Sequence, residues 1–267
     1  MIARLFFLLF CAIGLICTPS QAQLYIEQAK VNLQVAGGEH LNGSLLVHNT
    51  SADPLSIKVY WEDFEYKAPY DGTKNFLPAG TAPGSANQWV TFSPQVFTIP
   101  GFAQQNIDYS VAIPNGIQEG HYGVLFFERS SLGKINNDEV NLVTRIGTLF
   151  FIEPTKKNKS AVIQDISIKG NGLSATFVNQ GNVILIPHTT FYIMQNGGLV
   201  FERGDSKKLY VPMGVSAPLN IVFKDKLKPG QYTVVINSDL DEGDVVVKEV
   251  ALTVDDGGQI TIGNSQG

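Results

Sequence analysis

The chain has 267 residues, of which 44% are hydrophobic and 16% are charged, and its formal net charge at pH 7 is −5. The acidic balance and the lack of a basic patch argue against nucleic acid as a partner. The length suits one large domain or two ordinary ones. Both cysteines, Cys11 and Cys17, lie before residue 23, so the rest of the chain has no disulfide and no cysteine-based metal site.

The first 22 residues predict a secretory signal peptide. One early cation, Arg4, precedes an apolar run that ends at Cys17, and Ser20-Gln21-Ala22 offers small residues for cleavage before Gln23. The apolar run is shorter than the roughly 20 residues of a membrane-spanning helix. A lipid anchor on Cys17 is disfavoured because the preceding Ile16 is not small. We therefore expect a secreted chain that has no stable membrane insertion once the leader is removed.

After residue 22, short alternating runs separated by Gly, Pro, Asn and Asp are abundant and helical periodicity is scarce, which predicts an all-β fold. The clearest strand is Leu55–Glu62, where Trp61 is expected as a core aromatic residue. The other strands expected before the middle of the chain are Leu24–Ile26, Val31–Val35, Gly43–Asn49, Trp89–Phe92, Val96–Ile99, Ile107–Ile113 and Gly120–Glu128.

An insertion is predicted at residues 63–88. From Asp63 to Gln88 the alternation stops, and Tyr, Gly, Pro, Asn and Thr dominate. A loop of this length inside a compact domain is uncommon and is usually functional or disordered. Two interpretations stay open: its tyrosines and Phe76 cover a surface or contact a partner, or the segment is a disordered insertion.

The longest strand is predicted over Val140–Pro154, after a polar hairpin near Gly133 to Asp138. The first half alternates, as in a strand with one wet face, whereas from Leu149 both faces are apolar, as in a strand covered on both sides. Pro154 and the polar run 155–160 read as a linker, which makes Pro154 the interdomain hinge. The first domain is therefore expected to span residues 23–154.

The second domain, residues 155–255, repeats the plan of the first, and residues 256–267 are expected to form a flexible tail. Ile117 to Tyr122 and Leu227 to Tyr232 share an aliphatic-x-x-Gly-x-Tyr pattern, which is typical of a tyrosine corner. Asn49 and Asn179 likewise end equivalent strands. The sequence thus predicts two tandem immunoglobulin-like β-sandwiches.

A signal peptide, two cysteine-free immunoglobulin-like halves and a long strand at their junction resemble the PapD-like periplasmic chaperones of the chaperone/usher pilus pathway. The resemblance implies a periplasmic location and secreted pilus-type subunits as partners, and it leaves open an outer-membrane usher as a second partner. The segments that carry it are Gly43–Asn49, Trp89–Pro94, Phe97–Pro100, Tyr122–Glu128, Leu149–Pro154, Phe177–Asn182 and Pro229–Tyr232.

In this family the long strand is lent to a subunit that lacks a strand. The resemblance therefore implies donor-strand complementation through Val140, Leu142, Thr144 and Ile146, which share one face of the strand. An edge strand that exposes Val140 and Leu142 offers main-chain pairing and side chains that fill pockets. Such an edge is an aggregation hazard if left uncovered. The alternative is that these residues face their own core, as in ordinary sandwich alternation.

The family also binds the subunit's terminal carboxylate with two basic residues, and the resemblance implies Lys30 as the first. The second position holds Thr148 or Leu149 here, and the nearest basic residue is Arg145. Arginine binds carboxylates bidentately, which keeps Arg145 as a candidate, the alternative being a solvated strand residue. Glu153 replaces the family's basic residue before the closing proline, so the usual interdomain ion pairing is not expected.

Nothing in the sequence indicates catalysis, a cofactor or a metal. The four histidines lie far apart, and neither a Gly-x-Ser-x-Gly motif nor a phosphate-binding glycine loop is present. The acidic run Asp239–Asp244 suggests calcium but lacks a full EF-hand loop, so a hairpin turn between the last two strands is expected. The alternative to a chaperone is a structural or adhesive cell-envelope protein that uses the 63–88 segment as its contact surface.

Overall fold

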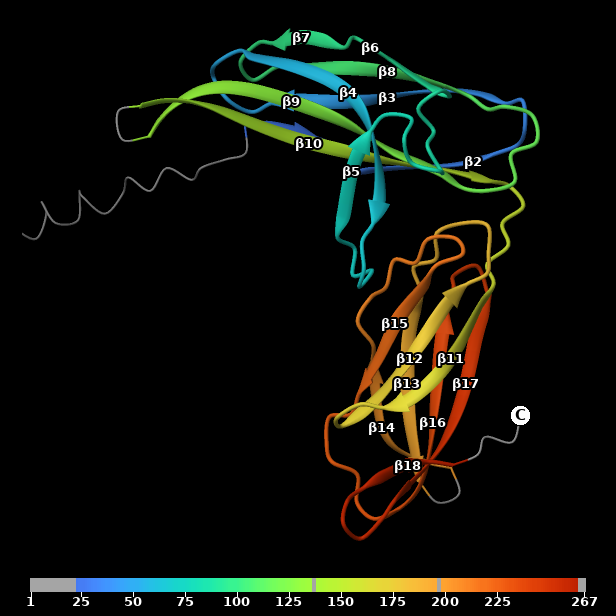
Figure 1. Cartoon of the computed structure of the whole chain (residues 1–267). Coiled ribbons are helices and arrows are strands. Elements are labelled where there is room, and N and C mark those ends of the chain that lie inside the picture. The colour runs from blue at the N-terminus through green and yellow to red at the C-terminus, as the bar shows by residue number, and fades with distance from the viewer. Residues whose placement is uncertain (1–22, 136–137, 196–197, 264–267) are drawn as a thin grey trace, which may run out of the picture.

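The computed structural model describes residues 23–135, 138–195 and 198–263, with the backbone alone over 131–141, and this part of the chain is all-β (Figure 1). Its strands form two sandwiches, and the first lies across one end of the second. The predicted fold class is confirmed. Within the described residues, no helix is long and apolar enough to cross a membrane.

Domain one, residues 23–154, packs a four-stranded sheet against a six-stranded sheet. The four-stranded sheet has the order β1-β3-β8-β6, and the six-stranded sheet has the order β2-β10-β9-β4-β5, with β7 also paired to β4. These strands are β1 (Leu24–Ile26), β2 (Lys30–Val35), β3 (His40–Asn49), β4 (Leu55–Tyr66), β5 (Lys74–Pro78), β6 (Val90–Ser93), β7 (Val96–Ile99), β8 (Gln104–Ala112), β9 (His121–Ile135) and β10 (Asp138–Pro154).

The core of domain one forms where the inward faces of these strands meet. Trp61 is buried there, with its ring centroid 5.4 Å from that of Phe150, as the alternation of β4 predicted. The indole lies directly on Gly123 of β9, where an added Cβ would come within 2.0 Å of the ring. Glycine is required at this position because any side chain would displace the tryptophan.

Domain two has sheets of three and five strands, ordered β11-β12-β15 and β14-β13-β16-β17-β18. Its core is continuous and includes the fully buried Phe177 and Phe191. The strands are β11 (Ala161–Ile168), β12 (Gly172–Asn179), β13 (His188–Gln195), β14 (Leu199–Asp205), β15 (Ser216–Val222), β16 (Gly230–Asp239), β17 (Val245–Val254) and β18 (Ile260–Ile262).

The predicted internal repeat holds at the asparagines and in part at the tyrosines. Asn49 and Asn179 are both buried, and each side-chain amide donates to carbonyl groups of two separate segments. The Tyr232 hydroxyl donates to the carbonyl of Lys228 at 2.9 Å, which confirms a tyrosine corner in domain two. Tyr122 instead accepts from the backbone N–H of Ile184 in domain two, so the prediction of a second corner is wrong.

The prediction that strand structure ends at Asp63 is also wrong. β4 continues to Tyr66, turns, and pairs with β5, so the 63–88 segment begins as a hairpin that projects toward domain two (Figure 1). Phe64 and Tyr66 are buried in an aromatic cluster on the outer face of the sheet. The apolar positions change parity here, because Phe64 and Tyr66 are buried on the outer face whereas Glu65 on the other face is exposed, so the pattern that marks the strand up to Trp61 does not continue.

Candidate functional site

One edge of β10 is open along most of its length. β10 pairs with β9 from Asp138 to Ile152, but it pairs with β2 only from Leu149 to Pro154. Between Asp138 and Thr148, the second edge of β10 therefore has no strand partner among the described residues. The opening ends where the Thr148 hydroxyl donates to the carbonyl of Gln28 and the Leu149 N–H donates to that of Ala29. Backbone groups along an open edge are available to pair with another strand.

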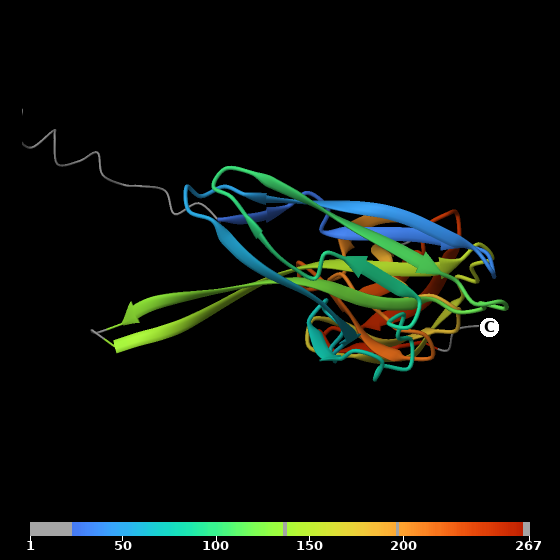
Figure 2. The same cartoon turned by 90° about the horizontal axis from the view of Figure 1, so that it is seen from above.

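The open edge continues into a ribbon that extends beyond the sandwich. β4 pairs with β9 only as far as Arg129, so the remainder of β9 and the start of β10 form a two-stranded hairpin that projects from domain one (Figure 2). On this ribbon Leu142 is 47% exposed and Val143 is 54% exposed. A two-stranded hairpin is marginally stable alone, and a third strand would strengthen it.

The four donor-strand candidates have different surroundings. Leu142 and Thr144 are exposed, whereas Ile146 is partly buried against the core of domain one. The side chain of Val140 lies outside the described residues. Ile146 therefore joins the ribbon to the sandwich, Thr144 lies opposite Arg129 at the base of the ribbon, and Leu142 lies on the part that projects.

A cleft of about 490 Å³ lies between the two domains, beside the end of β10. Lys30 lines it, with Nζ 3.6 Å from the centre of the Phe151 ring. Burial is the main cause that lowers the pKa of Lys30, and the nearby carboxylate of Glu153 opposes this effect. The other lining residues are Asn32, Leu33, Gln34, Lys157, Lys159, Val183, Ile184, Ile186, Leu240 and Asp241.

Arg145 lies elsewhere, on the outer face of the six-stranded sheet. Its guanidinium forms an ion pair with Glu62 at 2.9 Å and lies over the ring of Phe126, 4.3 Å from its centre. Arg145 is absent from the lining of the cleft that contains Lys30. The structure therefore separates the two anchor candidates: Lys30 is in the cleft and Arg145 is paired on the sheet.

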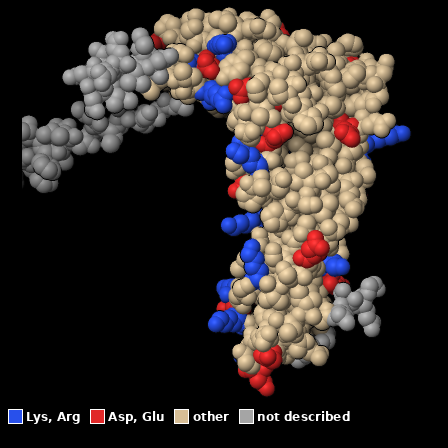
Figure 3. Space-filling view, viewed as in Figure 1, with Lys and Arg blue, Asp and Glu red and all other residues tan. Residues whose placement is uncertain are grey.

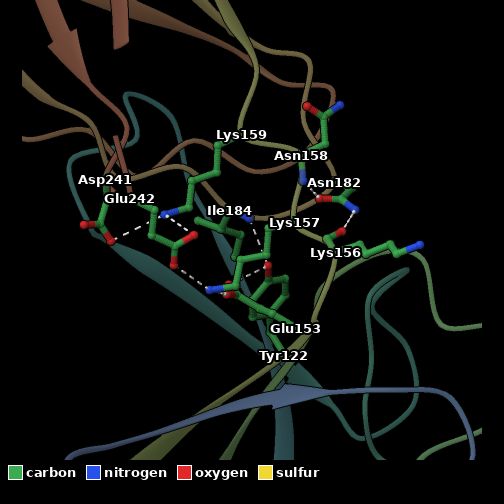
Figure 4. Close-up of polar contacts among 10 residues, drawn as sticks. All are labelled: Tyr122, Glu153, Lys156, Lys157, Asn158, Lys159, Asn182, Ile184, Asp241 and Glu242. Atoms are coloured by element: carbon green, nitrogen blue, oxygen red, sulfur yellow. Dashed lines mark hydrogen bonds and ion pairs between the residues drawn. The ribbon is translucent and has the colours of Figure 1, made fainter. Parts of the chain in front are cut away.

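The linker after Pro154 is held by ion pairs that cross the domain boundary (Figure 4). Lys157 lies between Glu153 of β10 and Glu242 of domain two, with both N–O distances at 3.2 Å. Lys159 pairs with Asp241 and Glu242, each at 3.4 Å. Burial opposes the charge of Lys157 most strongly, but the hydrogen bonds to Glu242 and Glu153 outweigh it and raise the pKa.

Sequence reasoning did not identify these linker lysines as site residues. Glu153 nevertheless takes part in ion pairing at the domain boundary, because the linker lysines Lys157 and Lys159 supply the cations. Asp241 and Glu242 belong to the turn between β16 and β17, as predicted, but these are not the last two strands, because β18 pairs with β17 inside the segment expected to be a flexible tail. No group of three or more His, Cys, Asp or Glu side chains among the described residues is arranged to hold a metal ion.

The interdomain ion pairs should weaken in acid. The pKa of Glu242 is lowered from 4.5, chiefly by the hydrogen bond from Lys157. The stabilisation is therefore complete above the unfolded value of 4.5 and is lost as the pH falls through the lowered folded value. We expect small-angle scattering to detect a wider spread of interdomain angles at this acid pH than at neutral pH.

Replacing Glu242 by glutamine should give that wider spread at neutral pH and should remove much of the acid response. If the unmodified protein gives the same scattering profile at neutral and acid pH, the ion pairs do not restrict the interdomain angle.

Comparison with known proteins gives a likeness in fold. No protein-family model matches the chain, and no curated protein matches it. A chain of the chaperone–tip adhesin complex of CFA/I fimbriae biogenesis matches with a TM-score of 0.55 at 15% identity, covering 85% of this chain and 98% of that one. The class 5 fimbriae chaperone CfaA matches with a TM-score of 0.55 at 14% identity and the same coverage. The chain thus has the two-domain immunoglobulin-like fold of these chaperones, and the resemblance is confirmed at the level of fold.

Proposed function

We propose that this protein is a periplasmic chaperone that binds secreted pilus-type subunits by adding β10 to their sheet. The observation that carries the proposal is the open edge of β10 from Asp138 to Thr148. Exposed Leu142 and Val143 lie on that edge. A strand edge of this kind binds by main-chain hydrogen bonds, and its alternate side chains fill pockets in the partner.

The donated segment is proposed to run from Val140 through Leu142 and Thr144, with Ile146 at its inner end. Ile146 packs against domain one, and because residues two apart on a strand share a face, Thr144 and Leu142 lie on the same face as Ile146. Leu142 then points to the same side as Ile146 but lies beyond the sandwich, where a subunit's core can receive it.

Lys30 is proposed as the anchor for the subunit's terminal carboxylate. It lies where β2 begins to pair with β10, next to the end of the open edge. No carboxylate lies within ion-pair distance of it in the described part of the chain. Arg145 stays a second candidate, but its ion pair with Glu62 must be broken or shared before it can bind a carboxylate.

The alternative, a structural or adhesive envelope protein, has less support. It requires the 63–88 segment as a contact surface, yet the hairpin of this segment packs against domain two through Tyr66 and Tyr70. An outer-membrane usher as a further partner rests on the family resemblance alone.

The proposal is tested by purifying the tagged mature protein from the periplasm of its host and identifying what co-purifies by mass spectrometry. A small secreted subunit in roughly stoichiometric amount is the expected result. A monomer without such a partner, or a protein bound to cell-wall material, would favour the structural alternative.

Reversing the charge of the anchor should weaken capture. In the same co-purification, Lys30→Glu is expected to bind at least about tenfold more weakly, since a cation in the cleft that meets an anion is replaced by a like charge. Arg145→Glu is expected to have a smaller effect because Glu62 already neutralises Arg145.

Lys169→Glu is the matched control, because Lys169 is a lysine of domain two whose side chain binds Asn220 away from the cleft. Thermal unfolding of each variant separates loss of the Lys30–Phe151 contact from loss of binding. Undiminished capture by Lys30→Glu would remove Lys30 as the anchor and would leave strand addition untouched.

A further inference from the structure

A row of aromatic rings crosses the boundary between the two domains. The ring of Phe151 on β10 lies 6.0 Å from that of Phe64 on β4, and Phe64 lies 5.6 Å from Tyr66. Tyr66 in turn stacks on Tyr210 of domain two, with centroids 5.0 Å apart and an interplanar angle of 27°. We call these four residues the aromatic row. It runs from the cleft, through the β4–β5 hairpin, into domain two.

Three lysines lie over this row. The Nζ of Lys30 is 3.6 Å from the centre of Phe151, that of Lys74 is 5.0 Å from Tyr66, and that of Lys208 is 5.4 Å from Tyr210. In the part of the chain that the structure describes, none of the three has a carboxylate within ion-pair distance. A cation–π contact attracts an ammonium group without neutralising its charge. Each of the three lysines can therefore still donate hydrogen bonds to an anion.

Lys74 and Lys208 are close enough to Lys30 for their charges to act on it. After burial and the opposing pull of Glu153, the causes that lower the pKa of Lys30 are the charges of Lys157, Lys208 and Lys74. Lys157 is neutralised by its own acidic partners, whereas Lys208 and Lys74 form no ion pair with any residue that the structure describes. Basic side chains also gather along the side of the molecule on which the hairpin descends toward domain two (Figure 3). The three lysines over the row therefore carry positive charge that no carboxylate of the described residues neutralises at ion-pair distance.

The 63–88 segment positions this charge. Lys74 belongs to β5, and the turn before it contacts domain two, where the Tyr210 N–H donates to the carbonyl of Tyr70 at 2.8 Å. Gly72, at a φ of +103°, lies against the Tyr210 ring, and an added Cβ would come within 2.8 Å of it. The insertion thus brings Lys74 and the Tyr66 ring beneath it next to Tyr210, the ring over which Lys208 lies.

We propose that Lys30, Lys74 and Lys208 form a binding site for an acidic segment of the captured subunit, one that carries more than one carboxylate. The inference rests on the proposed strand addition. A subunit strand that pairs with the open edge of β10 must end where β2 begins to pair with that edge, opposite Lys30. The subunit residues next to that end would then meet the aromatic row. One terminal carboxylate neutralises one cation, so acidic side chains of the same segment are needed for the other two.

The site is tested with synthetic peptides that share one alternating Val/Thr strand and carry either three aspartates or three asparagines at one end, all with amidated C-termini. We expect the unmodified protein to bind the aspartate peptide roughly tenfold more tightly at low salt, since each partly exposed ion pair adds a factor of a few. The difference should shrink as salt is raised.

The double variant Lys74→Gln/Lys208→Gln should lose most of this preference. Lys224→Gln/Lys226→Gln, which removes two cations from the exposed loop between β15 and β16, should keep it. Thermal unfolding of both double variants reports whether loss of the contact to Tyr66 or Tyr210 has disturbed the fold.

Equal affinity of the two peptides for the unmodified protein would overturn the acidic-segment site, and so would a preference that survives in the Lys74/Lys208 variant. The asparagine peptide reports on strand addition by itself. If Leu142→Asp abolishes its binding, the proposed function stands whatever the lysines do. If only the aspartate peptide binds, and only through the lysines, the site stands and strand addition fails.

Discussion

Replacing Leu142 by aspartate is expected to abolish subunit capture and to leave the stability of the protein unchanged. Leu142 is 47% exposed on the projecting ribbon, so a charge there meets water in the free protein. In a complex formed by strand addition, the same side chain enters the partner's apolar core. An unpaired buried charge costs several kcal/mol, which corresponds to a loss of affinity of at least about a hundredfold.

The measurement is the yield of co-purified subunit, together with thermal unfolding of the variant. Val245→Asp is the matched control, because Val245 is a similarly exposed aliphatic residue (51%) on β17 of domain two. It should capture the subunit as the unmodified protein does. Full capture by Leu142→Asp would exclude this part of β10 as the donated strand. Loss in both variants would point to a general effect of added negative charge.

Much of the fold was predictable because most strands bury one face and expose the other to solvent. The alternation of β4 up to Trp61 and the first half of β10 follow from this rule, and the repeated pattern before Asn49 and Asn179 marks the matching ends of β3 and β12. The rule fails where a second surface covers the outer face. Beyond Asp63, Phe64 and Tyr66 on the outer face of β4 pack into the aromatic cluster while Glu65 is exposed, so the apolar positions move to the other parity of the strand.

The site was predictable to a smaller extent, because contacts between the two domains bring its residues together. Lys30 could be placed by resemblance, since it stands next to a recognisable strand. Lys157 and Lys159 read as an ordinary polar linker, although their side chains are only 12% and 8% exposed. Lys208 acquires its proposed role through the stacking of Tyr66 on Tyr210. No spacing rule predicts a contact between residues this far apart in two domains.

Domain one itself should depend strongly on a single buried carboxylate, that of Asp63. This side chain is fully buried, and its Oδ2 accepts the backbone N–H groups of Thr81 and Ala82 at 2.8 and 3.0 Å. Its Oδ1 accepts the Ser85 hydroxyl at 2.7 Å and the Trp61 indole N–H at 3.2 Å. The carboxylate thus joins β4 to the loop that follows β5.

Asp63→Ala is expected to destabilise domain one by about 3–5 kcal/mol, because it leaves several donors without an acceptor at a buried position. Urea unfolding gives this free energy from the transition assigned to domain one. Asp63→Asn keeps the shape of the side chain and one acceptor oxygen, so its free energy of unfolding should lie between those of the unmodified protein and Asp63→Ala. Asp71→Ala is the matched control, since Asp71 is an exposed aspartate of the same segment that accepts the backbone N–H of Thr73. It should cost no more than about 1 kcal/mol.

The loss should extend to the interdomain contact. The loop held by Asp63 pairs with β9, where the Tyr122 N–H donates to the carbonyl of Gly84 at 2.8 Å, and the Tyr122 hydroxyl accepts from Ile184 in domain two. When the loop is released, Tyr122 loses one of the contacts that position it, so Asp63→Ala should also widen the spread of interdomain angles in scattering. A loss of stability below about 1 kcal/mol would mean that other contacts hold the loop and that the carboxylate is dispensable. A large loss with an unchanged angle would instead confine the effect of Asp63 to domain one.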